Sequence, residues 1–153
     1  MNLNDRITVA LASDHAGYLL KEALIKHLND RGIDTIDCGT NSAESCDYPD
    51  YAVAGCCKVL DGQADLTILC CGTGIGMSMA AGKMKGIRAA CCSDAFSAKY
   101  TRLHNNANVL CLGARVVGEG LACELADIFV DTGFEGGKHQ RRIDLISDLE
   151  NSR

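Results

Sequence analysis

The sequence predicts an α/β protein with a doubly wound parallel sheet of five strands and a C-terminal helix. Strand-like and helix-like segments alternate five times along the 153 residues, which is the order of a parallel sheet joined by helical crossovers. The strand-like segments carry few charges, as strands do when helices cover both faces of a sheet. One of them, 66–71, runs directly into a glycine-rich turn. No low-complexity linker interrupts the pattern, so we expect a single domain over 1–153.

Each strand–helix unit has a local signal of its own. A charge-poor strand over 7–13 precedes a helix whose apolar residues keep helical spacing from Leu20 to Leu28, and Gly32 ends that helix. Pro49, the only proline, suits the first turn of the second helix. The same alternation predicts the other elements: strands over 33–38, 66–71, 87–92 and 108–112, and helices over about 50–60, 77–83, 94–104, 119–130 and 139–149.

Composition limits the classes of function. The net charge of −5 argues against a general nucleic-acid or membrane binder, and no apolar run is long enough to span a bilayer. The first residues are polar and lack the apolar core of a signal peptide. Ten cysteines without any Cys-x-x-Cys spacing predict buried thiols in a reducing compartment, not zinc ribbons or a disulfide framework. We therefore expect a cytoplasmic protein with no nucleic-acid or membrane partner.

The turn at 72–76 is the strongest functional signal. Its three glycines allow several backbone N–H groups to converge at the start of a helix, which predicts an anion cradle. Cys71 precedes the cradle, where a thiol gains thiolate character and can act as a nucleophile or base. The turn lacks the G-x-G-x-x-G spacing of dinucleotide sites, and the stretch from Gly76 to Lys83 departs from P-loop spacing. A turn that needs glycines only for packing is the alternative.

Polar side chains also follow other expected elements. Asp14 and His15 come after the first strand, where they either cap the next helix or handle protons. His104 and Asn105 lie at a helix end, where capping alone would explain them. The basic run that begins at Lys138 opposes the dipole of the last helix, which favours a bound anion there.

Short stretches spread over nearly the whole chain form a recognisable set. They are SDHAG at 13–17, DYPD at 47–50, CGTGIGMS at 71–78, GIRAA at 86–90, SA at 97–98, RLHN at 102–105, ANVL at 107–110, GARV at 113–116 and FEGGKH at 134–139. The set resembles the ribose-5-phosphate isomerase B family, which also includes the galactose-6-phosphate isomerase subunits. The resemblance implies a Rossmann-like three-layer sandwich. It also implies an aldose–ketose isomerase of the pentose phosphate pathway that interconverts ribose 5-phosphate and ribulose 5-phosphate through an enediolate, with no metal or organic cofactor.

The same resemblance implies roles for individual residues. Catalytic roles fall on Cys71 as the base, on His104 as the acid that opens the furanose ring, on Asp14 close to it, and on Thr73 in the turn. Substrate contacts fall on Asp14, His15, Gly72, Thr73, Gly74, Ile75, Gly76, Asn105, Arg115, Lys138 and Arg142, the last three holding the phosphate. The family implies a homodimer, or a dimer of dimers, with shared active sites. The tail from about residue 134 would reach the partner's site.

Two positions bear on the subgroup and two alternatives stay open. Family members without the cysteine use a glutamate after the turn; Met77 stands there, so the chain falls in the cysteine subgroup. Lys138 occupies a position where the family usually has arginine; the lysine keeps the charge but loses the bidentate fork.

The substrate could instead be a six-carbon sugar phosphate, such as allose or galactose 6-phosphate. A nucleotide-binding Rossmann-like module is the alternative from a different class.

Overall fold

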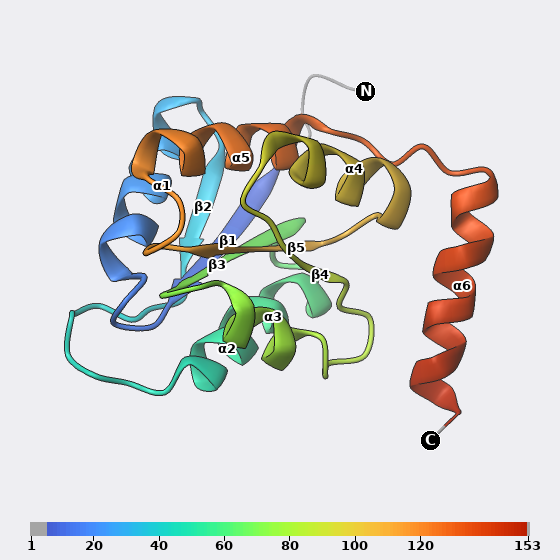
Figure 1. Cartoon of the computed structure of the whole chain (residues 1–153), viewed down its shortest axis with the longest axis horizontal. Coiled ribbons are helices and arrows are strands. Elements are labelled where there is room, and N and C mark those ends of the chain that lie inside the picture. The colour runs from blue at the N-terminus through green and yellow to red at the C-terminus, as the bar shows by residue number, and fades with distance from the viewer. Residues whose placement is uncertain (1–5, 153) are drawn as a thin grey trace.

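The computed structural model describes residues 6–152 and confirms the predicted α/β fold with a five-stranded parallel sheet. The strands lie in the order β2-β1-β3-β5-β4, and every neighbouring pair is parallel (Figure 1). The elements are β1 Thr8–Ser13, α1 Tyr18–Asp30, β2 Asp34–Asp37, α2 Tyr48–Leu60, β3 Leu66–Cys71, α3 Ile75–Ala81, β4 Ala89–Cys91, α4 Ala95–Asn105, β5 Val109–Gly113, α5 Glu119–Asp131 and α6 Lys138–Asn151.

Two apolar layers flank the sheet. Side chains of α1, α4 and α5, among them Leu24 and Phe129, form one core with the sheet, whereas α2 and α3 form the other around Met77. Strand alternation sends Cys70 into the first core and Cys71 into the second, as the sequence predicts. Helix α6 belongs to neither layer and stands beside the body near α4 (Figure 1). Among the described residues, no helix combines the length and apolarity needed to cross a bilayer.

The element ends differ from the predicted ones where turns compete with regular structure. β4 is only three residues long, because Ile87 is held in a turn by its N–H bond to the carbonyl of Met84. Helix α3 begins at Ile75, two residues earlier than predicted, because Gly74 already serves as its N-cap with a left-handed φ of 79°. Helix α2 begins at Tyr48, with Pro49 in its first turn as expected.

The strand order places three loops side by side at the carboxyl edge of the sheet. The chain winds outward from β1 to β2, returns to β3 beside β1, and inserts β5 between β3 and β4. The register pairs Ser13 of β1 with Cys70, and Cys71 of β3 with Gly113 of β5. The loops after β1, β3 and β5 therefore start at the same level, which is where doubly wound sheets bind ligands.

Candidate active site

The glycine turn is built around the thiol of Cys71. The backbone N–H of Gly74 donates a hydrogen bond to Cys71 Sγ at 3.0 Å, and the thiol is 5% exposed. The backbone at Gly74 is left-handed, and a side chain there would lie 2.9 Å from Cys91 Sγ and 3.0 Å from the carbonyl carbon of Leu112. Only glycine fits this conformation and this space. The turn thus holds the sulfur of Cys71 in a fixed place with a backbone donor aimed at it.

The end of β5 supports the same turn. The N–H of Ala114 donates to the carbonyl of Cys71 at 2.8 Å, and that of Arg115 donates to the carbonyl of Gly72 at 3.0 Å. The Arg115 guanidinium lies against Gly72, 3.4 Å from the place where a β-carbon would be. Inside the turn, Thr73 Oγ1 accepts the N–H of Ile75 at 3.2 Å. The structure thus brings an exposed cation against the turn that carries Cys71.

Asp14 and His15 are fixed beside the turn by the end of β1. The N–H of Asp14 donates to the carbonyl of Cys70 at 3.1 Å, and its Oδ1 accepts the N–H of Gly17 at 3.0 Å. The second bond closes the turn before α1 and does not cap the helix, because the N-cap of α1 is Gly17 and has no side-chain hydrogen bond. A β-carbon at Gly17 would lie 2.3 Å from the carbonyl oxygen of Cys70, which explains glycine there. His15 Nδ1 accepts the N–H of Cys46 at 3.2 Å, which leaves its Nε2 as the donor of a neutral ring.

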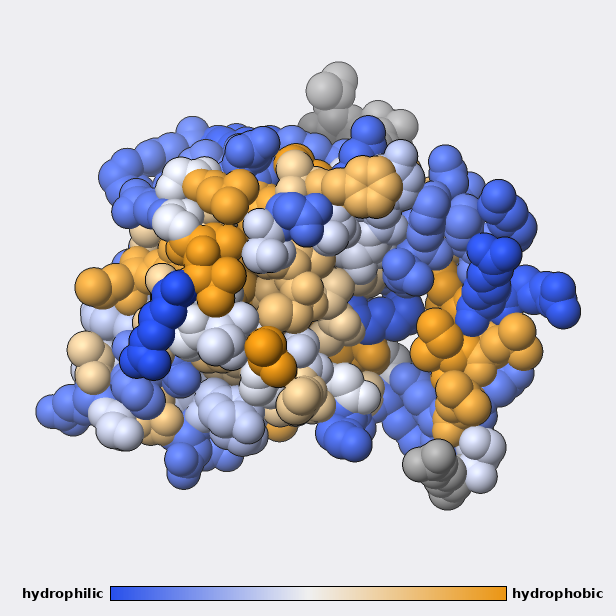
Figure 2. Space-filling view, viewed as in Figure 1, coloured by the Kyte–Doolittle hydropathy of each residue, from blue (hydrophilic) through white to orange (hydrophobic). Residues whose placement is uncertain are grey.

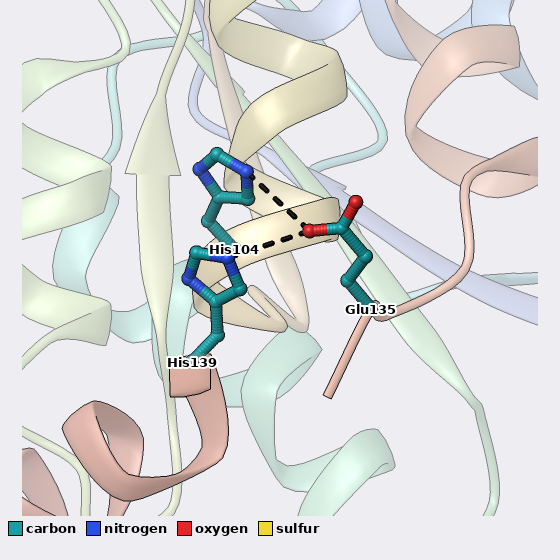
Figure 3. Close-up of side chains that lie close together, drawn as sticks. All are labelled: His104, Glu135 and His139. Atoms are coloured by element: carbon teal, nitrogen blue, oxygen red, sulfur yellow. Dashed lines mark ion pairs between the residues drawn. The ribbon is translucent and has the colours of Figure 1, made fainter. Parts of the chain in front are cut away.

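His104 belongs to a second group of side chains. Its ring stacks on that of His139, with centroids 4.1 Å apart and planes 9° apart (Figure 3). Glu135 Oε2 lies 3.7 Å from His104 Nε2 and 3.4 Å from His139 Nε2. The N–H of Glu135 donates to the carbonyl of Leu103 at 3.0 Å, which ties the tail to the last turn of α4. His104 and Asn105 also line a groove of about 370 Å³ along α4.

The two groups lie at opposite edges of the sheet. Helix α4 starts after the carboxyl end of β4 and ends beside its amino end, where Arg88 Nε donates to the carbonyl of Asn106 at 2.8 Å. The ten residues from Asp94 to His104 cover about 15 Å at helical rise. Within one chain His104 is therefore not close to Asp14, because α4 carries it away from that edge. The expected proximity of the two residues stays a prediction for a site shared between two chains. Its described partners are Tyr100, Glu135 and His139.

The basic tail lies with the second group. Lys138 and Arg142 are exposed on the first turns of α6, and neither forms an ion pair with any described residue. His139 is buried between them, and this burial lowers the pKa of its imidazole below the usual 6.5. The neighbouring charges of His104, Lys138 and Arg142 act in the same direction, while Glu135 raises that pKa. Two unpaired cations beside a neutral imidazole can receive an anion.

Sequence reasoning gave no role to three residues near these groups. Lys21 has a fully buried side chain whose Nζ contacts Asp37 Oδ1 at 2.5 Å, and the same oxygen accepts the N–H of Gly39 at 2.9 Å. The signal that could have indicated a buried lysine is the helical spacing of Lys21, which places it with Leu24 and Leu28 on the apolar side of α1. The sequence shows Glu135 and His139 only as part of the basic tail. They follow His104 by 31 and 35 positions, so their contact with it becomes visible only in the folded chain.

Comparisons with known proteins agree with this architecture. The family model described as Ribose/Galactose Isomerase matches residues 9–146. Ribose-5-phosphate isomerase B of Escherichia coli K12 is 46% identical over 145 residues, which cover 95% of this chain and 97% of that protein. The solved structure of the Clostridium thermocellum ribose-5-phosphate isomerase B has a TM-score of 0.94 and 43% identity, covering 95% of this chain and 98% of the other. The Mycoplasma genitalium structure with bound ribulose 5-phosphate has a TM-score of 0.91 and 42% identity, covering 96% and 98%. The resemblance found in the sequence is thereby confirmed.

Proposed function

The chain belongs to the ribose/galactose isomerase family, and we propose that it interconverts ribose 5-phosphate and ribulose 5-phosphate. The observation that carries the chemistry is the 3.0 Å hydrogen bond from the Gly74 N–H to Cys71 Sγ, which prepares a base beside a turn of backbone donors. The substrate is supported by the names of the Escherichia coli relative and of the Mycoplasma genitalium neighbour, which binds ribulose 5-phosphate.

The reaction needs a base and a place for negative charge. In the proposed mechanism, Cys71 as thiolate takes the proton from C2 of the open-chain aldose and leaves an enediolate, whose charge rests on the oxygen at C1. Backbone N–H groups of the turn from Gly72 to Gly76, which the family implies, hold that oxygen, apart from that of Gly74, which points at Cys71 Sγ, and that of Ile75, which points at Thr73 Oγ1. A proton then passes from the hydroxyl at C2 to the oxygen at C1, so that the charge moves to the oxygen at C2. The same thiol returns its proton to C1, and the ketose forms with its carbonyl at C2. The protein supplies positioning and preorganised donors, which are the larger contributions to such catalysis.

The second group completes the site only if it comes from another chain. His104 and the tail lie at the opposite edge of the sheet from Cys71, too far to act on one small sugar. We propose a homodimer in which the Cys71 turn, Asp14, His15 and Arg115 of one chain meet His104, Asn105, Lys138 and Arg142 of its partner. Each of the two equivalent sites then takes one group from each chain, as closed twofold symmetry requires. His104 would open the furanose ring, and the three cations would hold the phosphate.

The surface of α6 supports this assembly. Leu145, Ile146 and Leu149 are 54%, 45% and 67% exposed, and Figure 2 shows apolar side chains gathered along α6 between polar ends. An apolar strip of this kind on a helix that stands beside the body favours burial against another chain. All ten cysteines are free thiols, which fits a reducing compartment, and we place the enzyme in the cytoplasm.

A coupled assay with three substrates tests the proposal. We expect turnover of ribose 5-phosphate, with lower kcat/KM for allose 6-phosphate and galactose 6-phosphate. A preference for a six-carbon substrate would replace ribose 5-phosphate and keep the reaction class. No isomerisation of any of the three would overturn the proposed function. Binding of labelled NAD or ATP in place of sugar phosphate would instead support a nucleotide-binding module.

A further inference from the structure

Three potential metal ligands converge where the tail meets α4. His104 comes from the last turn of α4, Glu135 from the segment before α6, and His139 from the first turn of α6. Their ligand atoms all lie within 4.8 Å of one another, and two of the three separations are 3.4 Å and 3.7 Å. Ligands of a tetrahedral zinc ion at 2.0–2.2 Å stand roughly 3.3–3.6 Å apart. Because the two rings are stacked with planes 9° apart, both imidazoles must rotate out of the stack before all three ligand atoms can reach one ion.

The fold holds this cluster together without an ion. The N–H of Glu135 is bonded to the carbonyl of Leu103, one residue before His104, and the N–H of His139 is bonded to the carbonyl of Gly136. The edge of the His104 ring meets Tyr100, with centroids 4.9 Å apart, and the His139 side chain is 8% exposed. Figure 3 shows the Glu135 carboxylate facing one nitrogen of each stacked ring. A preformed set of two imidazoles and one carboxylate is the ligand combination that zinc and its neighbours prefer.

The charges around the cluster set how tightly it can hold a metal. Glu135, with a side chain 56% exposed, supplies the negative charge and an open approach from solvent. Lys138 and Arg142 face His139 and oppose a dication. Their charge limits the affinity and favours reversible binding over a permanent structural site.

We propose that His104, Glu135 and His139 bind a divalent transition metal of the zinc class, with a fourth position left to water. The metal is a regulator and not a cofactor: an occupied site takes the His104 nitrogen that would carry the proton, and so inhibits ring opening. This inhibitory consequence depends on the proposed function, whereas the binding itself does not.

Cobalt titration of the full-length protein tests binding directly. We expect one equivalent of Co²⁺ per chain to give visible d–d absorption of a low-symmetry site without the near-ultraviolet charge-transfer band of thiolate ligation, and Zn²⁺ to displace it. Glu135→Gln and His139→Ala should each weaken Co²⁺ about tenfold or more. His27→Ala is the matched control, because His27 pairs with Asp127 elsewhere on the surface, and it should bind like wild type. Circular dichroism would show that the variants are folded.

The possible outcomes separate the site from the activity. No d–d band under excess Co²⁺, a thiolate charge-transfer band, or full binding by His139→Ala would overturn the proposed site. If the site exists and the protein is an isomerase, Zn²⁺ should inhibit reversibly, EDTA should restore activity, and Glu135→Gln should require about ten times more Zn²⁺ for half-inhibition relative to its own zinc-free rate. A protein that binds Co²⁺ at these residues without isomerase activity would leave the metal site standing and overturn the proposed function alone.

Discussion

The backbone N–H of Gly74 points at the sulfur of Cys71 across 3.0 Å, and only Gly72 and Thr73 lie between the two residues in the chain. The neighbouring thiol of Cys70 faces the opposite core and is fully buried, and this burial raises its pKa. The two adjacent cysteines thus have different environments: Cys71 receives a backbone hydrogen-bond donor, and Cys70 is an apolar packing group. The pair offers a matched test of the proposed base.

Cys71→Ala should remove nearly all isomerisation, because loss of a general base usually costs about 100-fold or more in turnover. Cys70→Ala should keep the activity and lower the free energy of unfolding by about 1 kcal/mol, as is usual for trimming a buried side chain. Turnover under saturating substrate and urea unfolding measure the two effects. Near-normal turnover of Cys71→Ala would show that this thiol is structural and that another group is the base.

His104→Ala should affect the ring form of the substrate more than an open-chain analogue. The proposed acid opens the furanose, whereas proton transfer between carbons is assigned to Cys71. We therefore expect a larger loss of kcat/KM with ribose 5-phosphate than with a substrate that cannot cyclise, by about tenfold or more. Equal losses with both substrates would contradict this division of roles. A pH profile alone does not assign the two roles, because interacting groups give apparent pKa values that belong to the pair.

The sequence predicts the sheet and one half of the site well, because both depend on local pattern. Charge-poor strands, helical periodicity and the glycine turn place Asp14, Cys71 and Arg115 at the carboxyl ends of strands, and the structure puts the loops that carry them side by side. The position of His104 is different. It depends on the direction and length of α4, and its contacts with Glu135 and His139 arise between segments 31 and more residues apart. Tertiary contacts of this kind leave no periodic signal in the chain.

The buried ion pair near the site should respond asymmetrically to substitution. The Lys21 side chain is 0% exposed, whereas that of Asp37 is 39% exposed. Asp37→Asn leaves a buried ammonium with only Glu22, 3.0 Å away, and should lower the free energy of unfolding by about 3 kcal/mol. Lys21→Met leaves a carboxylate that water can still reach, and should cost about 1 kcal/mol or less. Urea unfolding measures both; a larger loss for Lys21→Met would contradict the burial argument.

His139 should make stability depend on pH in one direction. Because burial lowers its pKa in the folded state below 6.5, the unfolded chain binds a proton more readily. The contribution of the neutral His139 ring to the free energy of unfolding is therefore complete above about pH 7. It is lost as the pH falls through 6.5 toward the pKa of His139 in the folded state. His139→Gln should flatten the loss of stability between about pH 7 and pH 5. Glu135→Gln should lower the pKa of His139 further, because the carboxylate raises it, and NMR titration of the ring would detect the shift. A pKa above 6.5 in the wild type would contradict the assignment.

The final prediction concerns which chain supplies each half of the site. A Cys71→Ala subunit retains a good tail, and an Arg142→Ala subunit retains a good base. Mixing the two inactive homodimers under exchange conditions produces heterodimers that have one site with both halves intact. Half of the dimers are then mixed and half of their sites work, so activity should return to about a quarter of wild type per chain. Steady-state rates after verified subunit exchange provide the measurement.

Because the two groups are separate, they determine which pairs of inactive variants should restore activity after subunit exchange. His104 lies with the tail and Arg115 lies against the Cys71 turn, so substitutions should complement across the groups and fail within them. Cys71→Ala with His104→Ala should therefore recover about a quarter of the activity, like Cys71→Ala with Arg142→Ala. Cys71→Ala with Arg115→Ala, and His104→Ala with Arg142→Ala, should recover nothing, because each site of every mixed dimer then carries one of the two changes and no site is intact. Silence in the two cross-group pairs after verified exchange would mean that both groups act within one chain. Recovery in a within-group pair would mean that its two residues serve different sites.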